Sequence, residues 1–181
     1  MKNDARVRYT KRVLRSALLK LMEEKPINNI TVKEVCALAE INRATFYGHY
    51  KDCFDLLEQI ENELIEDYTD SLKYLSGFDV TELLEAIFGL IERNMDLCRL
   101  LVFDHPDNAL IQKMIEATHD KSIEGWRSRL THATEEDMEM LYTCLSNGLM
   151  RVVVEGYNRY DKQKLVDFVN TMAVSSATPY L

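Results

Sequence analysis

Residues 30–57 read ITVKEVCALAEINRATFYGHYKDCFDLL, and this stretch decides the fold. It opens with Thr31 and Glu34, a T-x-x-E capping box in which each side chain satisfies a backbone amide at the start of a helix. The predicted helix is short and ends near Ala39.

A second short helix follows after a tight connection. Asn42 is a good N-cap for a helix from Arg43 to about Tyr50, and Phe46 and Tyr50 would share its inner face because they are four residues apart. Two short helices joined by a tight turn predict a helix-turn-helix. The second helix of that motif fits the DNA major groove and presents its first residues to the base edges.

The outer face of this second helix carries side chains suited to DNA. Three residues near its start can face base edges: Arg43, Ala44 and Thr45. Arginine pairs bidentately with guanine, alanine allows close approach, and threonine can contact a thymine methyl group. Three later residues suit phosphates, which position a protein without reading sequence: Tyr47, His49 and Lys51. For His49 the alternative is a hydrogen bond to a local backbone carbonyl.

The charge of the chain is divided unevenly along its length. Residues 1–51 hold 11 Lys and Arg against 5 Asp and Glu, a net charge of +6. Residues 52–181 hold 11 against 25, a net charge of -14, so the whole chain is at -8. A basic head on an acidic body predicts a polyanionic partner for the head alone. We therefore expect a DNA-binding domain over 1–51 and a second domain over 52–181.

The rest of the chain also predicts helices, and the fold class is all-α. A first helix is expected from about Val7 to Glu24, and Asp52 caps a long fourth helix that joins the three-helix head to the body. Five further helical segments are expected, roughly Val80–Asn94, Asp96–Phe103, Asp107–Arg129, Thr134–Asn158 and Asp161–Ala173. The breaks between them include Asp104-His105-Pro106 and caps at Thr134 and Asp161.

Other site chemistry is missing from the sequence. No nucleophile–base arrangement, phosphate-cradling glycine loop or metal-ligand spacing is found, so no enzyme, metal or cofactor is expected. The alternative is a zinc site that residues such as the four histidines assemble in three dimensions: His49, His105, His119 and His132. Four cysteines lie in periodic helical segments and are expected to be buried or half-buried free thiols: Cys36, Cys53, Cys98 and Cys144. No apolar run approaches the roughly 20 residues of a membrane span. The expectation is a cytoplasmic protein without a membrane partner.

The string from Ile30 to Leu57 resembles the TetR/AcrR family of bacterial regulators, in which a threonine-led helix and a turn precede an aromatic pair followed by x-H-aromatic-K. The matching residues are Phe46, Tyr47, His49, Tyr50 and Lys51. The resemblance implies an all-helical homodimer that binds operator DNA, usually as a repressor, and that a small molecule in the body releases. It also implies backbone-contacting roles for Thr31 and Lys33, base reading by the residues from Arg43 to Thr45, and phosphate contacts by Tyr47, His49 and Lys51.

Two positions depart from the family pattern. Glu40 stands where the family often has glycine, and from this we expect the turn to avoid the left-handed conformation that glycine tolerates best. Cys53 stands where the family often has Lys or Glu, so one plausible phosphate contact is missing. Both departures keep a rival function open, a helical interaction module that acts through a protein partner with weak or no specific DNA binding.

The last two helical segments are the expected dimer interface, as the resemblance implies. The residues assigned to it are Leu141, Leu145, Gly148, Leu149, Val152, Gly156, Leu165, Phe168, Val169 and Met172. The two glycines, eight apart on nearly one face, could let a partner helix approach closely. The alternative is that these residues simply pack inside one chain.

A ligand pocket in the body is expected from large apolar residues spread over its helices, with polar residues to fix the ligand. The candidates are Phe88, Phe103, His119, Trp126, Tyr142 and Asn147. The alternative for each is an ordinary place in the core. The acidic body favours a cationic or neutral ligand over an anionic one, unless its charge is only a solvated surface.

Overall fold

The computed structural model describes residues 2–74, 78–103 and 109–181. The regular elements of these residues are helices, with no strand among them, which confirms the all-α prediction. The chain divides into two compact units, Met1–Leu64 and Ile65–Leu181, here called the head and the body. The sequence analysis instead divided the chain between residues 51 and 52. Leu56, Ile60 and Leu64 of the long fourth helix belong to the first unit and are buried.

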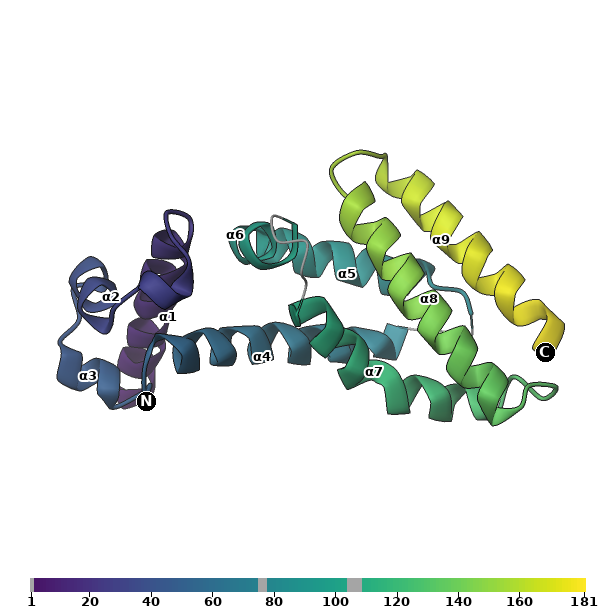
Figure 1. Ribbon diagram of the computed structural model, residues 1–181, viewed down its shortest axis with the longest axis horizontal. Helices are drawn as coiled ribbons and strands as arrows, with labels where there is room; N and C mark the ends of the chain where they lie inside the picture. The colour runs from purple at the N-terminus through teal and green to yellow at the C-terminus, as the bar shows by residue number, and fades with distance from the viewer. Residues whose placement is uncertain (1, 75–77, 104–108) are drawn as a thin grey trace. The chain divides into compact units, whose positions relative to one another are not determined.

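The described part of the head contains α1, α2, α3 and the start of α4, which Figure 1 labels. Its elements are α1 (Lys2–Met22), the 3-10 turn η1 (Ile27–Asn29), α2 (Val32–Ala39), α3 (Arg43–Tyr47) and the first part of α4 (Cys53–Ser71). α2 packs on both α1 and α3. Five fully buried side chains come from all four helices: Leu14, Leu18, Val35, Phe46 and Leu56. This core fixes α2 and α3 in place, so the outer face of α3 is held rigidly.

Two helix bounds in the head differ from the prediction. α1 begins at Lys2 rather than near Val7, since no proline or glycine interrupts residues 2–7. α3 ends at Tyr47 rather than near Tyr50. Beyond it the chain turns more tightly, because the amides of His49 and Tyr50 both donate to the carbonyl oxygen of Phe46, each at 2.9 Å.

The body contains the end of α4 and the remaining elements. They are η2 (Leu72–Tyr74), α5 (Thr81–Arg93), α6 (Met95–Cys98), the π-helical segment η3 (Arg99–Phe103), α7 (Ala109–Arg127), α8 (Glu135–Gly156), α9 (Lys162–Ala177) and η4 (Thr178–Tyr180). α8 and α9 lie side by side and antiparallel (Figure 1). α7 packs on α8, and α5 packs on α9. The single helix predicted over 96–103 is thus divided into α6 and η3.

The predicted caps in the body are confirmed. Thr134 and Asp137 form a reciprocal capping box at the start of α8, and Asp161 accepts from the amides of Gln163 and Lys164 at the start of α9. The predicted break at Asp104-His105-Pro106 lies outside the described residues. Within residues 2–74, 78–103 and 109–181, no helix is both long and apolar enough to cross a membrane.

The cysteine prediction is correct for three residues and wrong for the fourth. Cys36, Cys53 and Cys98 are buried and lie outside any disulfide. Cys144 is exposed, because it lies on the outer side of α8 rather than on the side that packs in the body. Helical periodicity placed Cys144 in α8 but did not show which side it occupies.

Candidate nucleic-acid interface and body cavity

The start of α2 is a fully formed capping box. The amide of Thr31 donates to Oε2 of Glu34 at 2.9 Å, and the amide of Glu34 donates to Oγ1 of Thr31 at 3.3 Å. The carboxylate also pairs with Nζ of Lys25 at 2.6 Å. Lys25 and then Thr31 lower the pKa of Glu34 to about 2, because both donate hydrogen bonds to its charged form. The hydroxyl of Thr31 therefore serves the cap, whereas Lys33, also assigned to DNA, is exposed.

The turn between α2 and α3 corrects the expectation for Glu40. This residue is left-handed, with φ 55° and ψ 36°, and is the non-glycine residue with positive φ among those described. The conformation lets the amide of Ile41 donate to the carbonyl oxygen of Cys36 at 3.0 Å, which closes the end of α2. The turn thus adopts the geometry that glycine favours, and Glu40 bears its steric strain.

α3 presents a polar outer face on an apolar anchor. Its first turn is capped by Asn42, whose Oδ1 accepts from the amide of Ala44 at 2.8 Å. Phe46 is fully buried beneath and contacts the rings of Tyr47 and Tyr50, with centroids 5.7 and 5.6 Å away. The structure brings together on the exposed side of α3 and the turn after it five of the predicted residues: Arg43, Ala44, Thr45, Tyr47 and Lys51.

His49 and Cys53 are placed differently from these five residues. His49 is half-buried, and its ring lies 6.2 Å from that of Tyr50. Cys53 is buried at the start of α4, and burial raises the pKa of its thiol. Cys53 therefore belongs to the core of the head, so this position presents no side chain to a phosphate.

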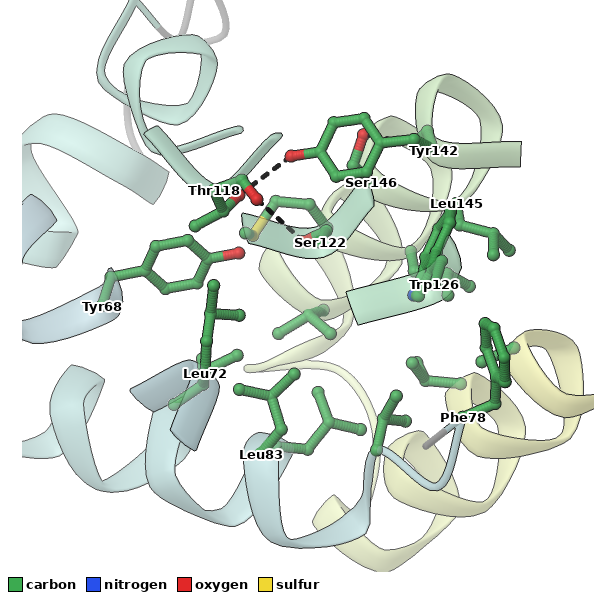
Figure 2. Close-up of a pocket in the computed structure, with 18 residues that line it drawn as sticks. Tyr68, Leu72, Phe78, Leu83, Thr118, Ser122, Trp126, Tyr142, Leu145 and Ser146 are labelled. Carbon is green, nitrogen blue, oxygen red and sulfur yellow. Dashed lines mark hydrogen bonds between the residues drawn. The ribbon is translucent and has the colours of Figure 1, made fainter. Parts of the chain in front are cut away.

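The body contains a partly open cavity of about 140 Å³ (Figure 2). Most of the described residues around it are apolar, and none is Asp, Glu, Lys, Arg or His. The lining comprises Tyr68, Leu72, Phe78, Val80, Leu83, Leu84, Ile87, Thr118, Ser122, Trp126, Tyr142, Leu145, Ser146, Leu149, Met150, Val153, Val169 and Ala173. A cavity of this size is comparable to those that hold a single benzene ring, roughly 150 Å³.

The hydroxyl groups of the cavity wall are largely engaged by the protein itself. The hydroxyl of Tyr142 donates to the carbonyl oxygen of Ile115 at 2.5 Å and lies 2.9 Å from Oγ1 of Thr118. Ser122 and Ser146 each donate to a backbone carbonyl one helical turn earlier, at 2.8 and 2.6 Å. Burial raises the pKa of the hydroxyls of Tyr68 and Tyr142, so both stay neutral.

The indole N–H of Trp126 differs from these hydroxyl groups. It is 8% exposed, and its Nε1 is the buried side-chain polar atom that has no hydrogen-bond partner among the described residues. This nitrogen is the blue atom beside the Trp126 label in Figure 2. A buried N–H without an acceptor costs free energy, so Trp126, a residue of the cavity wall, carries one unsatisfied donor.

The structure divides the predicted ligand residues among three places. Trp126 and Tyr142 line the cavity. Phe88 and Phe103 instead pack against Tyr157, at ring distances of 5.8 and 5.5 Å. His119 and Asn147 lie beside Tyr142 in an open groove between α7 and α8. Sequence reasoning missed Thr118 and Ser122, although with Trp126 they form an i, i+4, i+8 stripe on α7 that could have revealed them.

His119 links α7 to α8 at the edge of that groove. Its Nε2 lies 2.8 Å from Oε2 of Glu139, its Nδ1 lies 2.9 Å from Oδ1 of Asp120, and its ring stands edge-on to Tyr142 at 4.9 Å. Glu139 and then Asp120 raise the pKa of His119, because both accept hydrogen bonds from the imidazolium. The two carboxylates occupy opposite ring nitrogens, an arrangement that holds a proton rather than a metal.

The predicted dimer residues fall into three groups in the single chain. Four are buried within the body: Leu145, Gly156, Leu165 and Val169. Three are half-buried: Leu141, Leu149 and Val152. Three are exposed: Gly148, Phe168 and Met172. Gly156 packs against its own chain, since a Cβ there would lie 2.6 Å from Cδ2 of Leu165, whereas Gly148 has no other atom within 4 Å of such a Cβ.

Comparison with known proteins bears on both units. A family model described as "Transcriptional regulator C-terminal region", TetR_C_8, matches residues 79–174. A curated relative, the uncharacterized HTH-type transcriptional regulator YxbF of Bacillus subtilis (strain 168), is 24% identical over 106 residues. That match covers 59% of this chain and 26% of YxbF, so the chain aligns with only about a quarter of that protein's length.

Solved structures show the same fold. The dihydroxyacetone kinase operon activator DhaS is 17% identical with a TM-score of 0.65, over 94% of this chain and 97% of DhaS. A putative TetR-family transcriptional regulator from Syntrophomonas wolfei str. Goettingen is 16% identical with a TM-score of 0.64, over 95% and 96%. The TetR family repressor AlkX from Dietzia sp. Strain DQ12-45-1b is 16% identical with a TM-score of 0.50, over 93% and 98%.

Proposed function

Since this chain belongs to the TetR family of transcriptional regulators, we propose that its head binds operator DNA through α3 and that a small molecule in the body controls this binding. The observation that carries the proposal is the outer face of α3, where Arg43, Ala44 and Thr45 are exposed above the buried ring of Phe46. A rigid anchor beneath exposed base-reading side chains is what major-groove recognition requires.

The proposed roles of the residues on this surface follow from their chemistry and their positions. Arg43 stands at the start of α3, where a cation is unfavourable for the helix dipole, and a guanine or phosphate would compensate that placement. Tyr47 and Lys51 are exposed beyond the reading residues and suit phosphates. Thr31 contributes by capping α2, and Lys33 adds an exposed charge on the same helix.

The test is the pairing of Arg43→Ala with a matched control, Arg159→Ala, which removes an exposed arginine from the body. Operator fragments would first be selected from a genomic pool by the purified protein. Arg43→Ala is expected to weaken operator binding by about 1–3 kcal/mol and to relax the base preference at one base pair of the operator. Arg159→Ala should leave affinity and preference unchanged. If Arg43→Ala keeps full operator affinity and an unchanged base preference, Arg43 does not read a base.

The same selection separates the rival function. Exposed Glu40 places a carboxylate between the two helices of the motif, which disfavours phosphate approach and supports an interaction module acting through a protein partner. If no DNA fragment is enriched, the result favours the interaction module over the DNA-binding regulator. If fragments are enriched, affinity should fall steeply with salt, because several phosphates are neutralised on binding.

We also propose a homodimer through α8 and α9. Support comes from apolar side chains exposed on these helices, with Phe168 50%, Met172 42% and Met140 63% exposed. Gly148 adds open space on α8 for a partner helix. Phe168→Asp is expected to shift sedimentation equilibrium to monomer, because a charge would be desolvated at the interface. Phe54→Asp is the matched control, since Phe54 lies in the head and is 53% exposed.

The direction of control is proposed as repression by operator occupancy, relieved by the ligand. The fold alone leaves this direction open, since its neighbours include a protein described as an activator and one described as a repressor. The measurement is transcription from a promoter carrying the selected operator. Purified protein should lower it, and a ligand of the body should restore it. An increase of transcription on adding the protein alone would assign activation instead.

A further inference from the structure

The cavity of the body has properties that restrict what can occupy it. Its described lining carries no charged side chain, so a buried ion there would be without a counter-ion. Its volume of about 140 Å³ is close to that of a cavity that holds a single six-membered ring. The occupant is therefore limited by both charge and size.

One polar group then distinguishes among neutral rings. Ser122, Ser146 and Tyr142 already donate their hydroxyl protons to backbone carbonyls. Thr118 likewise has carbonyl acceptors at 2.9 and 3.1 Å on its own helix, and the hydroxyl of Tyr68 hydrogen-bonds with the side chain of Thr118. Nε1 of Trp126 remains as a buried donor with no partner in the described chain. A ligand that supplies an acceptor to this atom removes the cost of the unsatisfied N–H.

We propose that the effector of this protein is a small, uncharged, mostly apolar molecule of about one ring, held by a hydrogen bond from Nε1 of Trp126 to an acceptor such as a carbonyl oxygen. This inference rests on the proposed function only in stating that the bound molecule controls DNA binding. The cavity and its donor exist whether or not the head binds DNA.

The experiment uses three ring probes of nearly equal size with the full-length protein and no DNA. They are methylcyclohexane, cyclohexanone and protonated cyclohexylamine, which are apolar, neutral with an acceptor, and cationic. The chain has 1 Trp, so an ¹⁵N-labelled sample gives one indole N–H signal, and this signal reports on the proposed hydrogen bond directly. Affinities come from titration calorimetry.

The affinity of cyclohexanone relative to methylcyclohexane should fall about fivefold in Trp126→Phe, the factor that one neutral hydrogen bond contributes, because the desolvation cost of the ketone is the same in both proteins. In the natural protein cyclohexanone should also move the indole N–H signal downfield, while the hydrocarbon does not. Ser128→Ala, an exposed site just beyond α7, should leave the relative affinity unchanged.

Three results would overturn the proposal. Tighter binding of the cation than of the ketone would reject an uncharged occupant. An indole N–H signal that cyclohexanone leaves unmoved in the natural protein, or a ketone-to-hydrocarbon affinity ratio that Trp126→Phe leaves unchanged, would reject the Trp126 donor. No binding of any probe would reject the cavity as a site for single rings. Failure of operator binding is measured separately, on DNA, and would contradict the proposed function without affecting these results.

Discussion

Replacing Glu40 by glycine is expected to stabilise the head. Glu40 has φ 55° and ψ 36°, a conformation that costs a residue with a Cβ about 1–2 kcal/mol. Glycine removes that strain but loses about 0.5–1 kcal/mol through its greater freedom in the unfolded chain. The net expected gain is about 0.5–1 kcal/mol, which corresponds to a two- to fivefold change in an opening equilibrium.

Hydrogen exchange measured by mass spectrometry is the suitable assay, since the single tryptophan lies in the body and does not report on the head. Amides of α2 and α3 should exchange about two- to fivefold more slowly in Glu40→Gly. Glu40→Gln is the control, because it removes the charge and retains the Cβ. It should leave exchange unchanged while raising operator affinity, since a carboxylate no longer faces the phosphates.

The reasoning would be refuted if Glu40→Gly exchanged as fast as Glu40→Gln. Left-handed geometry at Glu40 would then carry no strain, and the gain from glycine would be absent. If both variants raised operator affinity equally, the effect on DNA would be one of charge alone.

Three further predictions concern other parts of the chain. Gly156→Ala should lower the stability of the body by about 1–3 kcal/mol, because its Cβ would meet Leu165 of the same chain; a weakened dimer with unchanged thermal unfolding would contradict this. Thr31→Ala should cost about 1 kcal/mol of head stability by hydrogen exchange, and Thr31→Ser should retain most of it. The pKa of His119 is raised by Glu139, so the stability that this pair contributes is present below the ordinary pKa and lost as pH rises through the raised one. An NMR titration of His119 that Glu139→Gln leaves unmoved would reject that cause.

Local chemistry made the head predictable from sequence. The capping box at Thr31, the cap at Asn42 and the buried pair Phe46 and Tyr50 each depend on residues close in the chain. The conformation of Glu40 was predicted wrongly because residue preference was weighed alone. The hydrogen bond from Ile41 to Cys36, which closes α2, selects the left-handed geometry despite its strain.

The cavity was less predictable, since it depends on which faces of distant helices meet. Phe88 and Phe103 pack around Tyr157 in the core. The size of these residues does not indicate whether they fill the core or line a cavity. Small polar residues, Thr118 and Ser122, leave the space that becomes the cavity. Periodicity places residues in helices but, as Cys144 shows, does not always identify the buried side, and it does not distinguish a filled core from a hollow one.

The unequal burial of the four cysteines makes Cys144 a natural label for assembly. Cys36, Cys53 and Cys98 are shielded, and burial raises the thiol pKa of Cys36 and Cys53, which slows alkylation. Cys144 is open to reagents on α8, one turn before Gly148 on the helix assigned to the dimer. Its alkylation rate in dilute and concentrated protein therefore measures whether that side of α8 becomes covered when two copies meet, without any engineered probe.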